Sequence, residues 1–201
     1  IADATYGLYR HNRHEINGRG YMNFTIIPGL TLENSLGYQY YNNNEILKND
    51  KFYGSAASTN GYLYRRNREM NFYNFLNLLR YQKTIGSHHI EALVAHEASE
   101  FTEKYNIMSG SNMVDPNSLD FNNLLVTNPN SGYTESYSLE SFFGQFNYDY
   151  NKTYLFSASL RRDGSSRFVN NKWGTFGSLG AGWVLSNEAF LESSTWLDFL
   201  K

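Results

Sequence analysis

The sequence of 201 residues contains no cysteine. This excludes disulfides, zinc–thiolate sites and cysteine nucleophiles. Charged residues make up only 18% of the chain, and the formal net charge of −2 does not favour broad electrostatic capture of nucleic acid. No apolar run approaches the roughly 18 residues of a membrane-spanning helix. The fold and function of this chain must therefore be inferred from features other than charge, thiols or long apolar helices.

The first residues, Ile1-Ala2-Asp3, carry neither a methionine nor the basic segment that opens a signal peptide. We therefore expect the chain not to begin where its gene begins. Aromatic residues reach 17% of the composition, with 17 Tyr, 14 Phe and 3 Trp. So much ring surface excludes a disordered tail.

Apolar and polar residues alternate with a period of two. From Leu30 to Tyr41, leucines and tyrosines occupy most even positions, while mainly polar residues occupy the odd ones. Just before this run, Met22, Phe24 and Ile26 alternate with polar neighbours, and Pro28-Gly29 separates the two segments as a tight turn. Residues 20–41 are therefore predicted to form a β-hairpin with one apolar face.

The same alternation recurs along the chain and predicts seven long strands. Their expected bounds are about 20–27, 30–41, 70–82, 88–103, 133–150, 153–162 and 174–186. The connections alternate between short turns and long polar loops, and the long loops are expected at about 42–69, 104–132 and 163–173. Outer-membrane barrels sort their connections in this way, and their strands need about 9–11 residues to cross the bilayer.

The fold class predicted is thus all-β, an antiparallel transmembrane β-barrel sector. Tyrosines gather towards the strand ends, as interfacial aromatic girdles do. Closed bacterial barrels have even strand numbers, and about seven strands with nothing after Lys201 do not close one. We therefore expect 1–201 to be part of one larger barrel domain.

Two alternatives remain open from periodicity alone. The first is a soluble or surface-attached all-β module that binds glycans through aromatic side chains, since sandwich strands also alternate with a period of two. The second is a small complete outer-membrane barrel. They differ from the sector in where the apolar face goes, because a sandwich buries it in a core whereas a barrel turns it to lipid.

Several motifs resemble a known family. The stretch Tyr154–Phe168 ends in Arg161, Arg162, Asp163, Gly164, Ser165, Ser166, Arg167 and Phe168, and Trp173–Ser178 and Ala181-Gly182-Trp183 follow it. In this order they are similar to the signature of SusC/RagA-type TonB-linked outer-membrane transporters. Leu79–Thr84 and His88–Glu97 fit an earlier motif of the same family. Gly177 replaces a usual proline, and His96 replaces a usual aromatic residue.

The resemblance implies a barrel of about 22 strands with a plugged lumen, in the outer membrane of a Gram-negative bacterium. It further implies import of an oligosaccharide or a peptide as solute, with a SusD-like surface lipoprotein as partner. Energy would come from TonB through regions outside this chain. The plug and N-terminal domains would also lie outside it, and the lipid bilayer would surround the strands.

Candidate binding residues lie in the longest predicted loop. They are aromatic and basic side chains, suited to sugar faces and to carboxylates or sulfates: Phe52, Tyr53, Tyr62, Tyr64, Arg65 and Arg66. Packing of that loop on itself or on the lipoprotein is the open alternative. The signature loop 161–168 is expected to be structural, with Arg161, Arg162 and Arg167 tying it to carboxylates on neighbouring strands.

The sequence predicts neither an enzyme nor a cofactor or metal site. No G-x-S-x-G, P-loop or G-x-G-x-x-G motif occurs. The adjacent histidines His88 and His89 point to opposite faces of a strand and so cannot share an ion.

Overall fold

The computed structural model describes residues 2–191 and 198–201. A short helix, α1 (Ala2–Tyr6), precedes the strands. The strands are β1 (Leu8–Ile27), β2 (Leu30–Asn49), β3 (Tyr62–Ile85), β4 (His88–Met113), β5 (Leu124–Thr127), β6 (Ser131–Tyr150), β7 (Tyr154–Ser165) and β8 (Trp173–Trp183). Three 3₁₀ turns span Ala57–Thr59, Phe121–Asn123 and Leu185–Asn187. Within the described ranges, no helix is both long enough and apolar enough to cross a membrane.

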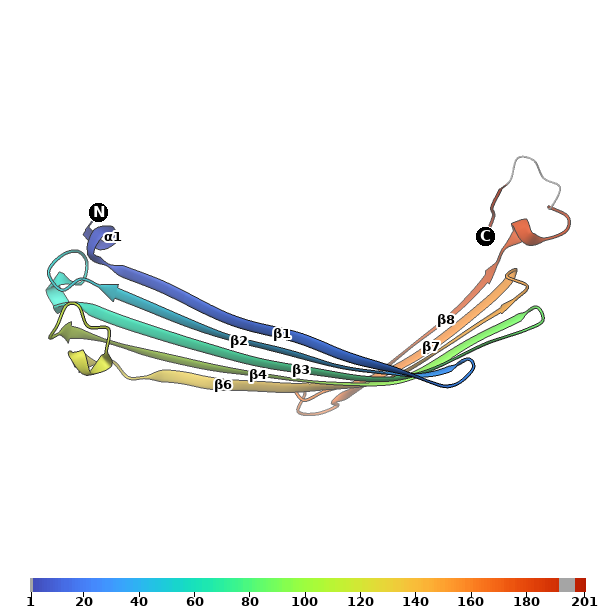
Figure 1. The fold of residues 1–201 in the computed structure, drawn as a ribbon, viewed down its shortest axis with the longest axis horizontal. Helices are drawn as coiled ribbons and strands as arrows, with labels where there is room; N and C mark the ends of the chain where they lie inside the picture. The colour runs from blue at the N-terminus through green and yellow to red at the C-terminus, as the bar shows by residue number, and fades with distance from the viewer. Residues whose placement is uncertain (1, 192–197) are drawn as a thin grey trace. The chain divides into compact units, whose positions relative to one another are not determined.

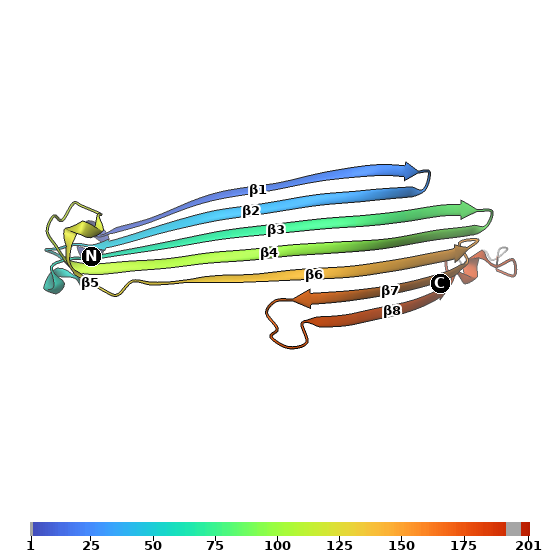
Figure 2. The same cartoon turned by 90° about the horizontal axis from the view of Figure 1, so that it is seen from below.

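All the strands belong to one sheet, in the order β1-β2-β3-β4-β6-β7-β8, with β5 paired to β4 (Figures 1 and 2). Neighbours in this order are neighbours in sequence, apart from the short β5. The β6–β7 and β7–β8 ladders are antiparallel, with Phe146 opposite Ala158 and Ala158 opposite Leu179. No pairing joins β1 to β8 in residues 2–191 and 198–201, so the sheet is open. The prediction of an all-β, antiparallel sector is confirmed.

The chain divides into two compact units, and the long strands pass through both. The first, here called the loop unit, comprises 1–18, 38–72 and 101–136 and holds the connections 50–61 and 114–130. The second, here called the turn unit, comprises 19–37, 73–100 and 137–201 and holds the tight turns. Each unit is described by itself below.

Tight turns in the turn unit use backbone conformations that the sequence supplies. Gly29 has φ +89°, and a Cβ there would lie 2.3 Å from the carbonyl oxygen of Gln82. Only glycine fits this approach, because the Gln82 amide also donates to the Gly29 carbonyl at 2.8 Å. In the β6–β7 turn, Asn151 and Lys152 both have positive φ, and the Thr153 amide closes the turn onto Tyr150.

Strand lengths differ from the sequence prediction at the loop end. The predicted loop 42–69 is strand up to Asn49 and again from Tyr62. The predicted loop 104–132 is strand up to Met113 and again from Ser131. Polar residues occupy most positions on both faces of these segments, so the regular apolar alternation that marks a strand is absent. The ladder continues because cross-strand polar pairs replace apolar ones, as where Asn67 donates to Asn44 at 2.8 Å. The predicted loop 163–173 shortens to 166–172, and the strand predicted from residue 20 begins at Leu8.

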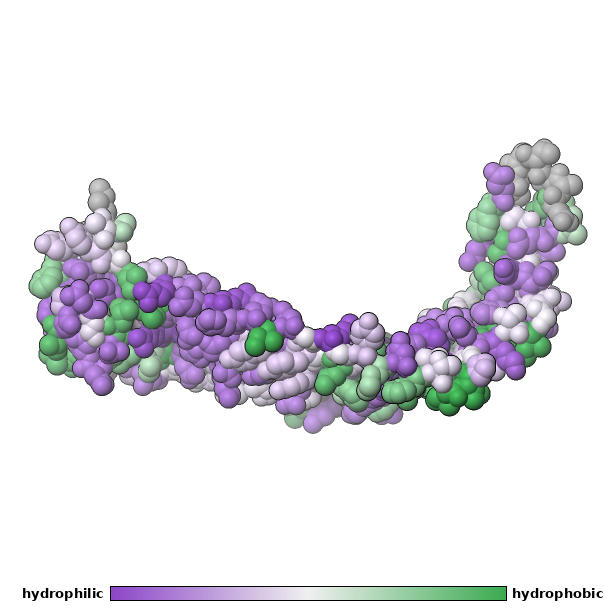
Figure 3. Space-filling model, viewed as in Figure 1, coloured by the Kyte–Doolittle hydropathy of each residue, from purple (hydrophilic) through white to green (hydrophobic). Residues whose placement is uncertain are grey.

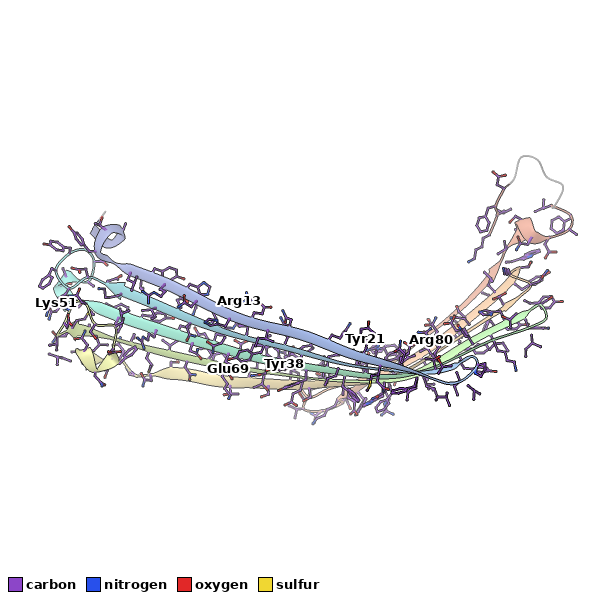
Figure 4. All side chains as sticks on the ribbon, in the orientation of Figure 1. Arg13, Tyr21, Tyr38, Lys51, Glu69 and Arg80 are labelled. Carbon is purple, nitrogen blue, oxygen red and sulfur yellow. The ribbon has the colours of Figure 1, made fainter. Side chains whose placement is uncertain are left out.

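Opposite faces of each unit differ in chemistry. In the loop unit, Arg13 lies on one side of the sheet and Tyr38 and Glu69 lie on the other (Figure 4). In the turn unit, Tyr21 and Arg80 share a side (Figure 4). Apolar side chains gather along one side of the turn unit, whereas hydrophilic ones cover much of the loop unit (Figure 3).

A small apolar cluster lies in the loop unit, where it joins the loops to the sheet. Leu63, Met113 and Leu124 are buried together, with relative exposures of 0%, 1% and 7%. Three partly buried residues pack on them, namely Ile46, Leu119 and Phe121. The amine of Lys51 donates to the carbonyl of Met113 at 2.7 Å. The connections 50–61 and 114–123 are therefore folded onto the strands.

Candidate functional site

One face of the loop unit is rich in tyrosine and arginine. Even positions of β3 and odd positions of β1, β2, β4 and β6 contribute to it, because side chains alternate along each strand. Ion pairs and ring contacts across these strands place the members on one side. This Tyr–Arg face consists of Tyr9, Arg13, Tyr41, Glu45, Tyr64, Arg66, Arg68, Glu103, Tyr105 and Tyr133.

Tyr41 lies between two guanidinium groups on this face. The Arg13 guanidinium carbon is 5.0 Å from the ring centroid of Tyr41, and that of Arg68 is 5.7 Å from it. Arg68 is fixed in turn, since its Nε and Nη2 donate to the two carboxylate oxygens of Glu103 at 2.5 Å and 3.0 Å. Glu103 is buried, and its hydrogen bonds raise the pKa of Arg68. The ring and both cations are thus held in place before any ligand arrives.

A second group on the same face joins three tyrosines. Arg66 pairs with Glu45 and hydrogen-bonds Tyr105, which raises the pKa of Arg66. Burial, and then the neighbouring Tyr105, raise the pKa of Tyr64. Tyr105 stacks on Tyr133 with ring centroids 5.1 Å apart. Its raised pKa keeps the Tyr64 phenol neutral near pH 7, so this hydroxyl can donate as well as accept hydrogen bonds.

This arrangement suits binding rather than bond cleavage. Aromatic faces stack on flat apolar surfaces, and fixed phenol and guanidinium donors bind hydroxyls, amide carbonyls or carboxylates. Among residues 2–191 and 198–201, no group of three or more histidine, aspartate or glutamate side chains is placed to hold a metal ion.

The turn unit has an apolar face made by even positions of β6 and β7 and odd positions of β8. The register places Phe146, Ala158 and Leu179 side by side on it. Large apolar side chains on this face are exposed, as for Leu160 at 62% and Leu179 at 80%. A sheet face of this kind is stable only when another apolar medium covers it.

Aromatic residues border the apolar face at both ends of β8. Trp173 and Trp183 occupy the ends of this 11-residue strand and share a face. At about 3.3 Å per residue they are about 33 Å apart along the strand. At the strand tilt of about 40° found in membrane barrels, this corresponds to a height of about 25 Å, which is the height of their apolar band. Near Trp183, Tyr154 donates to Glu188 at 2.7 Å, and Trp183 donates to the same carboxylate at 2.9 Å.

The opposite face of the turn unit is charged. Arg80 on β3 lies between Glu33 of β2 and Glu91 of β4, at 3.0 Å and 2.7 Å. These pairs cross three neighbouring strands, so they tie the sheet together on its polar side. One face of the unit therefore suits lipid, and the other suits water.

Comparison with known proteins identifies the family. No family model matches the chain. TonB-dependent receptor P39 of Formosa agariphila is 32% identical over 187 residues, which cover 90% of this chain and 18% of that receptor. TonB-dependent receptor SusC of Bacteroides thetaiotaomicron is 30% identical over 187 residues, covering 89% of this chain and 17% of SusC. The solved structure of the RagAB peptide transporter matches with a TM-score of 0.88 and 26% identity, over 95% of this chain and 22% of that one.

The chain belongs to the SusC/RagA-type TonB-dependent receptors. It spans between 17% and 22% of the length of these relatives. The family resemblance found in the sequence motifs is confirmed, and the relatives are named as receptors and transporters rather than as enzymes.

The SusC/RagA signature loop is fastened to neighbouring strands at several points. Arg161 donates from Nε to Asp163 at 2.7 Å and from Nη2 to Ser141 at 3.1 Å, and it lies 3.6 Å from Glu97. Ser166 bonds the backbone of Ser138 twice, since its hydroxyl accepts from the Ser138 amide at 2.8 Å and its own amide donates to the Ser138 carbonyl at 2.9 Å.

The other two arginines of the signature contact rings. Arg162 lies over Trp173 at 5.2 Å, and Arg167 lies over Tyr137 at 3.9 Å. Three further members of the signature, Asp163, Gly164 and Ser165, are the last residues of β7, and Gly164 packs against the Trp173 ring. Phe168 is exposed.

The six predicted binding residues of this receptor segment separate into three places. Tyr62, Tyr64 and Arg66 occupy even positions of β3, which put them on the side of the Tyr–Arg face. Arg65 points to the other side, where it donates to the Leu119 carbonyl at 2.7 Å and lies over Phe121.

The other two predicted residues lie in the loop 50–61 and are exposed. Phe52 lies beneath the amine of Lys51, and Tyr53 stacks on Tyr6 with centroids 4.7 Å apart. The sequence interpretation names Arg68 beside Arg65 and Arg66, but it does not select Arg13, Tyr41 or Glu103. The even spacing of Tyr62, Tyr64, Arg66 and Arg68 is the signal that separates them from Arg65.

Proposed function

We propose that the full receptor imports a nutrient across the outer membrane of a Gram-negative bacterium, and that this segment forms part of its barrel wall. The observation that carries the proposal is the two-sided turn unit. Its apolar face is bordered by Trp173 and Trp183 at the height of a membrane band, and its other face is lined by the Arg80 ion pairs. The apolar face meets lipid, and the charged face lines the lumen.

The solute contacts the Tyr–Arg face of the loop unit. Tyr41 between Arg13 and Arg68 offers a ring flanked by donors, and this suits an oligosaccharide or a peptide. The relative RagAB is named as a peptide transporter. Of the predicted binding residues, Tyr62, Tyr64 and Arg66 belong to this contact.

A SusD-like surface lipoprotein docks on the loop unit. The loops of the loop unit carry exposed apolar side chains above the buried cluster of Leu63, Met113 and Leu124. Exposed apolar side chains on a well-packed base are typical of protein interfaces. The exposed side chains are Phe52, Tyr53, Val114, Leu125 and Val126, exposed by 50–69%. Phe52 and Tyr53 thus contact the lipoprotein rather than the solute. TonB supplies energy through regions outside this chain, and the signature loop holds β6, β7 and β8 in register.

Membrane location is tested first, in cells that carry the epitope-tagged full receptor. Outer membranes are separated, and boiled and unboiled samples are run side by side. We expect a heat-modifiable outer-membrane band several times heavier than 23.2 kDa. A soluble band that boiling does not shift contradicts the barrel and favours an all-β binding module.

Solute binding is tested with a matched pair of tyrosines on β2. Tyr41 belongs to the Tyr–Arg face, whereas Tyr38 lies on the other side and donates to Asn71 at 3.0 Å. Uptake of labelled oligosaccharide and peptide mixtures is measured in a strain lacking the native receptor. We expect Tyr41→Ala to reduce uptake of one class by about tenfold, the loss of one stacking contact, with Tyr38→Ala close to wild type. Equal uptake by the two variants contradicts the assignment of this face.

A further inference from the structure

The apolar face of the turn unit carries a groove of about 690 Å³. Small residues on three neighbouring strands line its low points, here called its floor: Ala92, Gly144 and Ala158. Bulky residues that also line it stand beside them, since Phe146 is opposite Ala158 and Leu160 is opposite Gly144. The space left over the small residues forms a channel that a flexible hydrocarbon chain can fill.

Gly144 keeps the channel open without being required by the backbone. Its φ is not positive, and an added Cβ would meet the Leu93 carbonyl oxygen at 3.4 Å and a Val94 methyl at 3.7 Å, which are ordinary contact distances. The sheet would therefore accept a larger residue there. Glycine at this position therefore matters for the shape of the sheet surface and not for the backbone conformation of β6.

Arg162 closes one end of the groove. Its guanidinium carbon lies 5.2 Å from the ring centre of Trp173, at the aromatic border of the apolar face. In residues 2–191 and 198–201, no carboxylate forms an ion pair with it. The nearby carboxylate of Glu140 is 3.1 Å from the ring nitrogen of His96, and that ring stacks on Phe142. One cation without a carboxylate partner thus lies where an apolar channel meets the head-group level.

We propose that this groove binds one phosphorylated lipid of the outer leaflet, with an acyl chain over Gly144 and a phosphate on Arg162. An arginine donates two parallel hydrogen bonds to a phosphate, and the Trp173 ring holds it at the correct depth. The inference rests on the outer-membrane location proposed above. It goes beyond import, because the ligand is a resident lipid on the outer surface of the wall and not a solute.

The test uses the full-length receptor purified from outer membranes in detergent and depleted of lipid. Phosphorylated lipid A and the same lipid after phosphatase treatment are added separately, and bound lipid is counted by native mass spectrometry. We expect the wild type to retain phosphorylated lipid A. Arg162→Gln lowers its retention by about tenfold, to the level of the dephosphorylated lipid. Arg162→Lys keeps the preference for phosphate.

Two further variants separate the groove from the rest of the apolar face. Gly144→Leu fills the floor, and we expect it to lose both lipids. Leu179→Val lies on the same face outside the groove, is 80% exposed, and is expected to bind as the wild type does. Each variant is first shown to give the heat-modifiable band of an assembled barrel.

Three outcomes overturn the inference: equal retention by wild type and Arg162→Gln, equal retention of the two lipids by wild type, or unchanged retention by Gly144→Leu. Each means that the face takes bulk lipid without a site. They are distinct from failure of the proposed function, in which the receptor is absent from the outer membrane.

Discussion

Arg68 and Glu103 form a two-pronged ion pair across β3 and β4, with Nε and Nη2 donating to the two carboxylate oxygens at 2.5 Å and 3.0 Å. The pair is one-sided in burial, because Glu103 is enclosed while Arg68 is about half exposed. Removing the arginine therefore leaves a buried carboxylate without its partner, which costs more than losing an exposed pair.

We expect Arg68→Gln to lower the free energy of unfolding of the full receptor by about 1–3 kcal/mol. The loss of the heat-modifiable band is followed against temperature in detergent. Arg13→Gln is the matched control, since Arg13 pairs with Glu15 at 2.7 Å on an exposed surface and its loss costs below about 1 kcal/mol. Equal shifts for the two variants would show that burial of Glu103 does not matter.

Leu160→Lys places a charge near the middle of the apolar face. We expect a cost of about 2–4 kcal/mol, the value for lysine at the bilayer midplane, and a smaller assembled fraction in outer membranes. Ser159→Lys is the control, because Ser159 lies on the opposite face, where its hydroxyl is 2.7 Å from that of Ser178 across the ladder. If Ser159→Lys is the more damaging variant, the two faces have been assigned the wrong way round.

Ser166→Ala removes the acceptor for the amide of Ser138 and frees one end of the signature loop. We expect a loss of about 1 kcal/mol locally and faster cleavage between residues 166 and 172 when intact cells are treated with protease. Val169→Ser serves for comparison, since Val169 is 89% exposed. A cleavage rate for Ser166→Ala equal to that of Val169→Ser counts against a structural role for this serine.

Gly29→Ala and Gly86→Ala separate backbone strain from close approach. Both glycines have positive φ, but a Cβ at Gly29 would lie 2.3 Å from the Gln82 carbonyl oxygen, whereas nothing lies within 4 Å at Gly86. We expect Gly86→Ala to cost about 1 kcal/mol and Gly29→Ala about 2–3 kcal/mol or more. Thermal loss of the folded band measures both. Identical midpoints contradict the tight packing of the first turn on β3.

The sequence predicts the turn unit well because one of its faces is apolar. Phe142, Phe146 and Leu160 mark their strands by alternation alone, and Pro28-Gly29 and Asn151-Lys152 mark the turns. Periodicity fails in the loop unit, where residues 42–49, 62–69 and 104–113 are strands with mostly polar residues on both faces. β5 also escapes prediction, since four residues paired to β4 carry too short a pattern.

The sequence alone predicts only those residues of the candidate site that lie on the single strand β3. Tyr62, Tyr64 and Arg66 share a parity in sequence, so their common side follows from strand geometry. Arg13, Tyr41 and Glu103 join them through the register of neighbouring strands, which depends on how turns and loops set each pairing. Residue type alone predicts Arg65 as a binding residue, whereas its packing on Phe121 follows from the fold of a distant loop.

The buried cluster of Leu63, Met113 and Leu124 has a consequence for recognition. A partner that meets disordered loops must offset the entropy of ordering them, and affinity falls accordingly. Here the ordering has been completed by the chain itself, in residues that no partner needs to touch. Substitutions at the exposed tips of these loops leave the cluster untouched, so the loop surface can change its chemistry while the entropy cost of ordering it stays the same.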